Sequence, residues 1–452
     1  MFPAFQGRAV SERSEHADGR GSLAGVAEEA HDVGVYDLAV IGLGYVGMPL
    51  AKEAAAAGLR VVGFEVDPAK VEALNAGRSY IDDLTDADLD HMLAGGFRAT
   101  LDESVLAASR TVVICVPTPL DEDHRPDLSA VEGATATVAR NLSAGTLVVL
   151  ESTTWPGTTD EVARPILEAS GLAAGTDFHL AFSPERIDPG NPKFGLRNTP
   201  KVVGGYTAAC RDRAVGFYSQ FVEQVVPVSG TREAEMAKLL ENTYRHVNIA
   251  LVNEMAIFCD ELGINLWESI EAAATKPFGF QKFLPGPGVG GHCIPVDPSY
   301  LSYTVRKLGY PFRFVELAQE INERMPSYVV ARVQRLLNRH KKAVNGARVL
   351  LLGVTYKPDI ADERETPALP VARALLELGA DLVFADPHVR EWRVDGMEVP
   401  REDDLARAVA EADVTLLLQQ HAAFDLATIE DHGRLVLDTR GVLAEGERVE
   451  RL

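Results

Sequence analysis

Residues 36–67 read YDLAVIGLGYVGMPLAKEAAAAGLRVVGFEVD, and this stretch decides the fold of the N-terminal half. The apolar run at 37–41 predicts a buried strand that leads into the motif Gly42-x-Gly44-x-x-Gly47. A helix and then a second strand are predicted to follow. A glycine motif is a weak signal alone, but it is specific between a strand and a helix with an acid at the end of the next strand. The stretch therefore predicts a Rossmann dinucleotide-binding unit.

Each glycine of the motif, and the acid at the end of the second strand, has a physical role in binding a dinucleotide. Gly42 makes the tight turn, Gly44 admits a pyrophosphate and Gly47 lets helix and strand pack closely, while the helix N-terminus supplies N–H donors. Glu65 ends the second strand, where it can accept from ribose hydroxyls and would repel a 2′-phosphate. We therefore expect NAD rather than NADP. Lys70, in the next helix, either reaches the adenosine side or is simply solvated.

The bulk composition narrows the class of protein. A length of 452 residues suggests about three domains. The formal net charge of −22 argues against nucleic acid or an anionic membrane as the main partner, although it does not exclude a phosphate-bearing substrate. Residues 1–34 have no apolar signal-peptide core and are expected to be a disordered tail.

Cysteine usage and hydropathy predict the compartment. The four cysteines have no paired spacing, which fits a reducing cytosol and gives no zinc signature, so no metal is expected; they are Cys115, Cys210, Cys259 and Cys293. No apolar run approaches the ~18 residues of a transmembrane helix. We expect a cytoplasmic protein.

Strand and helix alternate through the rest of the first domain, and polar residues follow the strand ends. Thr118 and Thr153 come after two apolar strands, where doubly wound sheets bind ligands, so we assign them to the cofactor cleft; the alternative for each is a local turn. Glu185 and Arg186 follow the strand predicted at 179–182, which exposes an acid and a base together.

Residues 231–262 contain no Gly or Pro and predict one long helix that stops at Gly263. Lys238, Asn242 and Arg245 share one stripe of it, and such a stripe is most often solvated surface. A second, apolar set consists of Met236, Leu240, Val247, Leu251 and Phe258. The helix is too long for one small domain, so we expect it to bridge two domains and to pair with a second subunit.

The segment 283–298, FLPGPGVGGHCIPVDP, holds one cysteine among four glycines and four prolines. Such a run cannot be the interior of a helix or strand, because Gly favours unusual φ values and Pro removes donors. A lone cysteine usually packs as a small buried hydrophobe. Here the loop composition favours an accessible, reactive Cys293, with Asp297 four residues further on.

The last third repeats the α/β pattern without a glycine motif. Two short helices are expected over 300–322 and an amphipathic helix over 328–339. A smaller Rossmann-like sheet then begins near residue 347, and its strand-end loops offer three cations suited to phosphates or a carboxylate, or else ordinary surface charges: Lys357, Arg364 and Arg440.

The predicted fold class is thus α/β, in four segments. They are a tail (1–34), an NAD-binding Rossmann domain (35–229), a central helical domain with the long bridging helix and the cysteine loop (230–325), and a C-terminal α/β domain (326–452).

Several motifs in this order resemble one family, the nucleotide-sugar 6-dehydrogenases of the UDP-glucose/GDP-mannose type. They are GLGYVG (42–47), VPTP (116–119), ESTTWPGTT (151–159), SPERIDPG (183–190), AEMAKLLENTYRHVNIALVNE (234–254), TKPFGF (275–280), PGPGVGGHCIPVDP (285–298) and LGVTYKPDIADERETPAL (352–369). The resemblance covers roughly residues 36–445. The versions at 183–190, 241–254 and 291–298 resemble the branch that oxidises UDP-N-acetylhexosamines, UDP-N-acetylglucosamine above all. UDP-glucose enzymes usually carry Lys where this chain has Val296.

The resemblance implies a reaction in which a sugar CH₂OH becomes a carboxylate with two NAD⁺ and one water. Lys238, through water and Asp297, is implied as the base, and Cys293 captures the aldehyde as a thiohemiacetal that is oxidised to a thioester. Lys238 and Asn242 would stabilise the oxyanions, and either Glu185 or Asp297 would activate the hydrolytic water.

The resemblance also implies binding residues and an assembly. Substrate binding carries over onto Arg186, Ile187, Lys238, Asn242, Arg245, Gly290, Lys357 and Arg440, and cofactor binding onto Tyr45, Val46 and, on the nicotinamide side, Arg364. Dimers through the long helix are expected. The alternatives are a UDP-N-acetylmannosamine or UDP-N-acetylgalactosamine enzyme, a two-electron NAD-dependent hydroxyacid dehydrogenase that needs no thiol, and a non-catalytic NAD-sensing protein.

Overall fold

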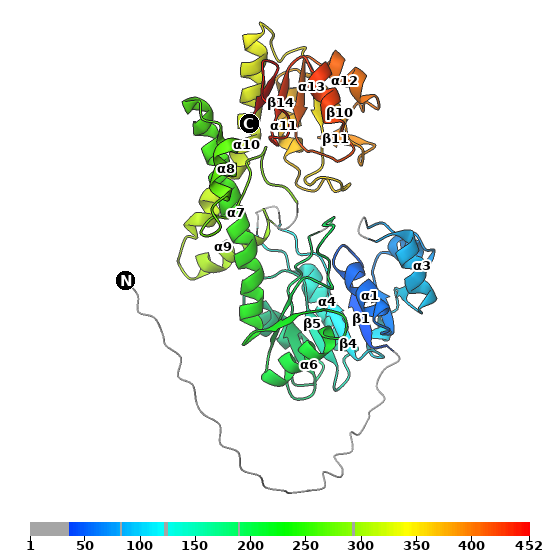
Figure 1. Ribbon diagram of the computed structural model, residues 1–452. Helices are drawn as coiled ribbons and strands as arrows, with labels where there is room; N and C mark the ends of the chain where they lie inside the picture. The colour runs from blue at the N-terminus through cyan, green and yellow to red at the C-terminus, as the bar shows by residue number, and fades with distance from the viewer. Residues whose placement is uncertain (1–35, 82–83, 122–124, 189, 292–293) are drawn as a thin grey trace, which may run out of the picture. The chain divides into compact units, whose positions relative to one another are not determined.

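The computed structural model describes residues 36–81, 84–121, 125–188, 190–291 and 294–452 (Figure 1). The predictions made for the tail at 1–34 and for Cys293 fall outside these described residues. Within them, no helix combines the length and the apolar character that crossing a bilayer requires.

The first sheet has eight strands, and the glycine motif follows β1, one of its interior strands. Its strands are β1 (Leu38–Ile41), β2 (Val61–Phe64), β3 (Arg98–Thr100), β4 (Thr111–Ile114), β5 (Leu147–Leu150), β6 (His179–Phe182), β7 (Lys201–Gly205) and β8 (Val225–Pro227). Their order is β3-β2-β1-β4-β5-β6-β7-β8, and every neighbouring pair is parallel except β6 with β7. All residues of β1, β2, β4 and β5 are buried, as expected for parallel strands covered on both faces.

Helices cover both faces of this sheet. They are α1 (Gly47–Ala56), α2 (Pro68–Asn75), α3 (Asp86–Ala94), the 3₁₀ turn η1 (Glu103–Leu106), α4 (Ser129–Arg140), the π-helical turn η2 (Thr159–Ala163), α5 (Arg164–Glu168) and α6 (Ala208–Tyr218). Leu38 and Val40 pack with α1, α3 and α6, whereas Ala39 and Ile41 pack with α4 and α5 on the other face. The period of two along β1 therefore separates two apolar layers.

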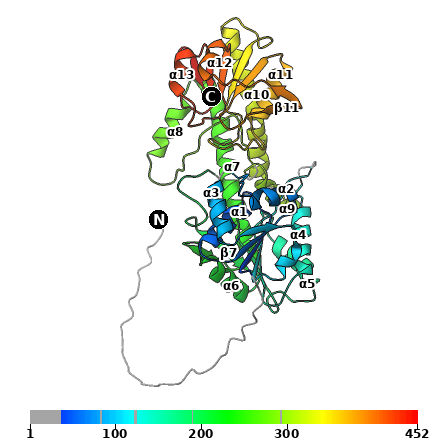
Figure 2. The ribbon, with the colours of Figure 1, turned by 90° about the vertical axis from the view of Figure 1, so that its right-hand side faces the viewer.

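The central segment is dominated by one helix of 32 residues, α7 (Thr231–Leu262). It begins after Gly230 and ends at Gly263, whose φ of 65° is the left-handed conformation that commonly closes a helix. Both bounds agree with the prediction. The remaining central helices are α8 (Leu266–Ala274), α9 (Asp297–Lys307) and α10 (Arg313–Arg339). α7 and α10 lie side by side (Figures 1 and 2).

The prediction of separate helices on either side of residue 326 is wrong, because α10 is one helix of 27 residues with Pro326 inside it. An internal proline removes one backbone hydrogen bond and costs about 3 kcal/mol. The helix persists because Met325, Val329 and Val333 line one buried stripe against the C-terminal core. The predicted domain boundary at 325/326 consequently falls within a continuous helix.

The C-terminal sheet has five parallel strands in the order β10-β9-β13-β14-β15. They are β9 (Arg348–Leu352), β10 (Asp381–Ala385), β13 (Val414–Leu417), β14 (Val436–Asp438) and β15 (Val449–Arg451), with a small hairpin of β11 (Trp392–Val394) and β12 (Met397–Val399). Its helices are α11 (Ala368–Glu377), α12 (Leu405–Glu411) and α13 (Leu426–His432). α10 and α11 pack on one face, α12 and α13 on the other.

Candidate active site

The three glycines of the first loop differ in what surrounds them. Gly42 has a φ of 88°, and a Cβ on it would lie 2.7 Å from the carbonyl oxygen of Cys115. A Cβ on Gly47 would lie 2.0 Å from the carbonyl oxygen of Gly42, so helix and loop pack backbone to backbone there. A Cβ on Gly44 would meet nothing within 4 Å. Gly42 and Gly47 are thus required by the fold, while open space lies over Gly44.

Glu65 lies beside this loop, at the end of β2. Its carboxylate accepts from the backbone N–H of Leu43 at 3.0 Å and from that of Val66 at 3.0 Å. A carboxylate has about four acceptor sites, so capacity remains for ribose hydroxyls. The open space over Gly44, the N-terminus of α1 and this carboxylate together fit a dinucleotide. The ammonium of Lys70 lies 5.8 Å from the ring centroid of Tyr80.

The strand-end residues predicted for the cofactor cleft are partly buried. Thr118 is buried, and its carbonyl oxygen accepts from the hydroxyl of Tyr300 at 2.9 Å. Thr153 and Val46 are half-buried. The guanidinium of Arg364 lies 5.3 Å from the ring centroid of Tyr45. The structure therefore brings Arg364, distant in sequence, into contact with the glycine loop.

Two of the three residues in the polar stripe of α7 face inward, contrary to the usual behaviour of such stripes. Lys238 and Asn242 are 7% and 6% exposed, whereas Arg245 is exposed. Lys238 Nζ donates to the carbonyl oxygen of Glu185 at 2.7 Å, and Asn242 Nδ2 donates to Asp297 Oδ2 at 2.5 Å. Two segments about 110 residues apart in sequence, one ending at Glu185 and one at Asp297, thus meet on the same helix face.

Asp297 is the most perturbed acid of this group. It begins α9 and is 3% exposed. Burial raises the pKa of Asp297 to about 6, although the Lys238 charge and the Asn242 hydrogen bond both lower it. A carboxyl group whose pKa lies close to neutrality can exchange protons under working conditions, which is the requirement for a general base.

Glu185 meets Lys238 through its backbone carbonyl oxygen, and its side chain is buried as well. One carboxylate oxygen accepts from the backbone N–H of Ile187, and the other is buried with no hydrogen-bond partner among the described residues. The next residue, Arg186, pairs with Glu241 at 2.7 Å and donates to the carbonyl oxygen of Pro200 at 2.5 Å. Arg186 is therefore fixed by two partners, while Glu185 keeps an acceptor available.

The glycine-rich loop that leads to Cys293 is anchored on two sides. The backbone N–H of Gly286 donates to Asn253 Oδ1 on α7 at 2.9 Å, and that of Gly291 donates to the Arg364 carbonyl at 3.1 Å. A Cβ on Gly290 would lie 2.6 Å from the carbonyl oxygen of Glu365, so only glycine fits there. The loop is held by backbone contacts up to the last described residue before Cys293.

Two of the predicted C-terminal cations face these segments. Lys357 Nζ lies 2.6 Å from Asp188 Oδ1, and Arg440 Nη1 lies 3.3 Å from where a Cβ on Gly286 would be. Burial lowers the pKa of Arg440 to about 10, which leaves the guanidinium charged at neutral pH. The structure thus directs Lys357 and Arg440 toward the 183–190 and 283–291 segments, and Arg364 toward the glycine loop.

Sequence reasoning missed Glu235 as a member of the inward stripe. It is fully buried on α7, and its carboxylate accepts from the backbone N–H groups of Gly157 and Thr159 at 2.6 and 2.9 Å. Glu235 precedes Lys238 by three residues, so helical spacing alone places the two side chains on the same face of α7 and could have identified Glu235. Its contacts attach the segment after Thr153 to α7.

A sheet whose glycine loop fits a dinucleotide, with a buried Lys–Asn–Asp group beside it, fits the class of NAD-dependent dehydrogenases. Comparison with known proteins agrees along the chain. Models of the UDP-glucose/GDP-mannose dehydrogenase family match with the NAD binding domain at residues 36–222, the central domain at 232–324 and the UDP binding domain at 350–445. The chain therefore belongs to this family, whose members are NAD-dependent nucleotide-sugar dehydrogenases.

Individual relatives extend over nearly the whole chain. The UDP-N-acetyl-D-mannosamine dehydrogenase of Yersinia pestis is 37% identical over 425 residues, which cover 90% of this chain and 98% of the relative. An NDP-N-acetyl-D-galactosaminuronic acid dehydrogenase of Ralstonia solanacearum is 34% identical, covering 92% and 98%. The solved structure of the UDP-N-acetyl-D-mannosamine dehydrogenase from Pyrococcus horikoshii superimposes with a TM-score of 0.83 at 33% identity, covering 92% and 98%.

Proposed function

We propose that this enzyme oxidises the C6 hydroxymethyl group of a UDP-N-acetylhexosamine to a carboxylate, in two hydride transfers joined by a covalent intermediate on Cys293. The observation that carries the proposal is the buried group on α7, in which Lys238 and Asn242 meet Glu185 and Asp297. A two-electron dehydrogenase has no need of the thiol loop that follows. NAD⁺, when bound, supplies the hydride acceptor for both oxidations.

The first oxidation needs a base for the C6 hydroxyl. Asp297, with its pKa raised to about 6 by burial, takes this proton through a water held by Lys238. General-base assistance of this kind is worth ~10²- to 10⁴-fold in rate. Cys293 then adds to the aldehyde as a thiohemiacetal, and loss of the second hydride gives a thioester.

Two tetrahedral intermediates form, the thiohemiacetal and the adduct of water with the thioester. Both develop negative charge on the former carbonyl oxygen. Lys238 Nζ and Asn242 Nδ2 lie one turn apart on α7 and are the donors for it; loss of one such donor can cost ~2.7 to 4 kcal/mol. Hydrolysis of the thioester needs a second activated water. One Glu185 carboxylate oxygen is buried without a hydrogen-bond partner in the described part of the chain, and this supports Glu185 rather than Asp297 as the base of this step.

Substrate recognition is assigned to groups around this cleft. Lys357 and Arg440 would neutralise the diphosphate, and the backbone at Gly290 would approach the sugar closely. Arg186, Ile187 and the exposed Arg245 would complete the substrate site. The domain assignment 35–229, 230–325 and 326–452 is part of the same proposal.

The identity of the hexosamine is the finer part of the proposal. The motif versions favour UDP-N-acetylglucosamine, whereas the names of the relatives favour UDP-N-acetylmannosamine and N-acetylgalactosamine derivatives. A panel of these three UDP-sugars and UDP-glucose, followed by NADH release and product mass, distinguishes them. The proposal predicts acid from at least one N-acetylhexosamine. Turnover of UDP-glucose alone would refute it.

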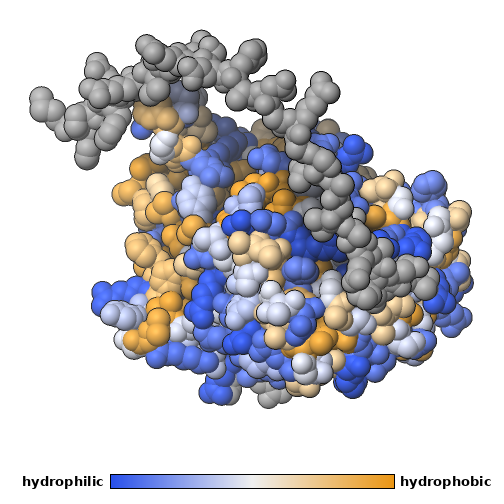
Figure 3. Space-filling view, turned by 90° about the horizontal axis from the view of Figure 1, so that it is seen from below, coloured by the Kyte–Doolittle hydropathy of each residue, from blue (hydrophilic) through white to orange (hydrophobic). Residues whose placement is uncertain are grey.

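We also propose a homodimer through α7. Four of the five residues in the apolar set of this helix are exposed: Leu240 is 61% exposed and Leu251 53%, and Met236 and Phe258 are exposed as well, while Val247 is half-buried. Tyr244 and Leu262 extend the same stripe and are also exposed. Figure 3, which views the molecule from below, shows apolar side chains gathered on its left, the side on which α7, α8 and α9 lie in Figure 1. An apolar stripe of this length normally marks an interface. Light scattering should give twice the chain mass for wild type.

A further inference from the structure

His421 follows β13 and is 1% exposed, which is unusual for a histidine outside the cleft. Its Nδ1 accepts from the backbone N–H of Asp359 at 3.0 Å, and its Nε2 lies 3.4 Å from the hydroxyl of Thr355. One imidazole ring therefore contacts both ends of the segment 355–359. Lys357 is the central residue of that segment.

The orientation of the ring is fixed by Asp386. His421 Nε2 lies 3.1 Å from Asp386 Oδ2, which also accepts from the backbone N–H of Val354 at 2.8 Å. Burial acts to raise the pKa of Asp386, but hydrogen bonds from His421, His388 and Val354 outweigh it and hold the pKa below its usual value. The ionised carboxylate accepts only, so Nε2 carries the proton and Nδ1 is left as the acceptor.

The segment 355–359 needs such restraint. Asp359 has a φ of 62°, in the left-handed region that residues other than glycine adopt uncommonly. Its carboxylate accepts from the backbone N–H of Ala422 at 2.7 Å, and the Thr355 hydroxyl donates to the Lys357 carbonyl at 2.9 Å. The backbone on both sides of Lys357 is thus attached to the residues that follow β13.

We propose that His421 is a positioning residue, which fixes the 355–359 segment so that the Lys357 ammonium is presented to the diphosphate of the nucleotide sugar. This inference rests on the proposed function, since it takes Lys357 as a diphosphate contact. His421 itself touches no substrate. Its effect is transmitted through the Asp359 amide and the Thr355 hydroxyl.

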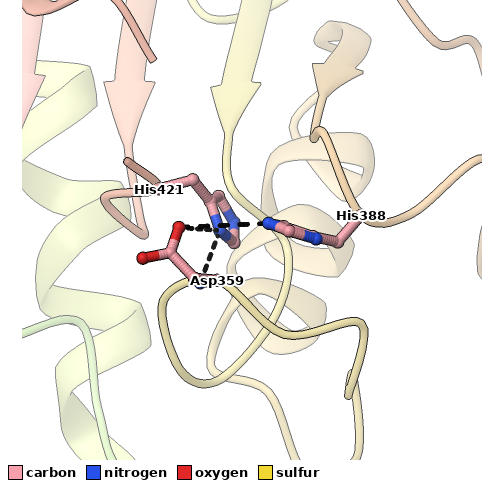
Figure 4. A group of neighbouring side chains, drawn as sticks. All are labelled: Asp359, His388 and His421. Carbon is pink, nitrogen blue, oxygen red and sulfur yellow. Dashed lines mark hydrogen bonds and ion pairs between the residues drawn. The ribbon is translucent and has the colours of Figure 1, made fainter. Parts of the chain in front are cut away.

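The same ring belongs to a group that resembles a metal site. Asp359, His388 and His421 each offer one ligand atom, all within 4.8 Å of one another, and Figure 4 shows the three side chains converging. However, the Nδ1 lone pair that would bind a cation already accepts the Asp359 N–H. We therefore interpret the group as a hydrogen-bonded cluster that holds the 355–359 segment in place. Metal binding is the alternative, and the test below distinguishes the two.

The test uses the full-length enzyme with His421→Ala and His421→Gln, and with His432→Ala as a matched control on an exposed histidine of the same sheet domain. We expect His421→Ala to weaken UDP binding in calorimetry, and to raise KM for the UDP-sugar, about tenfold. KM for NAD⁺ should stay within about twofold. Gln retains one donor and one acceptor and should restore part of the affinity.

A double-mutant cycle separates positioning from general damage. In a Lys357→Met background, His421→Ala should produce no further loss of UDP affinity, because its effect is transmitted through Lys357. Thr355→Val, which removes only the hydroxyl, is the second variant should His421→Ala fail to fold, and it should behave in the same way. Additive losses in the cycle, or unchanged UDP affinity in the folded single variants, would overturn the inference.

Two further outcomes are informative. If purified enzyme binds Zn²⁺ stoichiometrically and His388→Ala loses this binding, the group is a metal site and the positioning role of His421 is refuted. A wild-type enzyme that neither binds UDP nor oxidises any UDP-sugar would refute the proposed function. An active wild type whose His421 variants bind UDP normally would refute only the positioning role.

Discussion

Replacing Asp297 by Asn should make the enzyme more stable and far less active at the same time. Asp297 is 3% exposed, and its raised pKa means that the folded protein binds the carboxyl proton more tightly than the unfolded chain does. The difference between the ordinary value of 3.8 and about 6 corresponds to about 3 kcal/mol between the two protonation states. Asn reproduces the shape and neutrality of the protonated acid and can still accept from Asn242.

The direction of the pH dependence follows from this pKa. Because the folded pKa is raised, the stability that the neutral form provides is fully present below pH 3.8 and is lost as pH rises through about 6. The Asn variant loses nothing over this range. We therefore expect wild type and variant to unfold at similar temperatures near pH 4, and the variant to unfold at a higher temperature at pH 8.

Activity should change in the opposite direction. A base must be ionised to accept a proton, so wild-type kcat/KM, which reports the groups of the free enzyme, should rise with pH around a midpoint of about 6. Asp297→Asn should lower kcat by ~10²- to 10⁴-fold and remove that limb of the profile. Thermal unfolding at the two pH values and steady-state kinetics measure both effects, with Asp403→Asn, an 81% exposed acid, as control. A variant that is less stable at pH 8, or that keeps wild-type kcat, would refute the reasoning.

Three further predictions follow from single contacts. Gly47→Ala should prevent soluble folding, because its Cβ would lie 2.0 Å from a backbone oxygen. Gly44→Ala should fold normally, because its Cβ would meet nothing within 4 Å, and should lose NAD⁺ affinity in calorimetry. Equal behaviour of the two variants would contradict the loop geometry. Glu65→Ala should raise KM for NAD⁺ by about tenfold or more without changing UDP affinity, and an unchanged KM would remove Glu65 from the ribose site. Leu240→Glu on the exposed stripe of α7 should yield monomers in light scattering, whereas Leu308→Glu, on a leucine that is exposed even more (72%) but lies in another segment, should not. A dimeric Leu240→Glu would place the interface elsewhere.

Local signals in the sequence were sufficient for much of the fold. The strand–glycine–helix arrangement at 36–67 is present in the structure, and the absence of Gly and Pro over 231–262 predicted both ends of α7. These features depend on neighbouring residues only. The continuity of α10 through Pro326 could not be predicted, because it depends on apolar contacts with a sheet that comes later in the chain.

The site was predictable as a set of residue types but not as an arrangement. Lys238 and Asn242 share a helix face by spacing, yet only the tertiary structure shows that this face is buried and that the apolar set faces outward. The same holds for Asp386 and His421, which lie 35 residues apart on different strand ends. Hydrogen bonds between such positions leave no periodic signal in a single sequence.

The central claim is that one thiol carries the sugar between two oxidations, and counting NADH per UDP-sugar tests it most directly. The account predicts two NADH and one uronic acid per sugar consumed by wild type. In Cys293→Ala, acid formation should cease and at most one NADH with free aldehyde should appear, whereas Cys259→Ala, on a buried thiol of α7, should retain the wild-type ratio. Wild-type release of one NADH with aldehyde as sole product, or continued acid formation by Cys293→Ala, would contradict it.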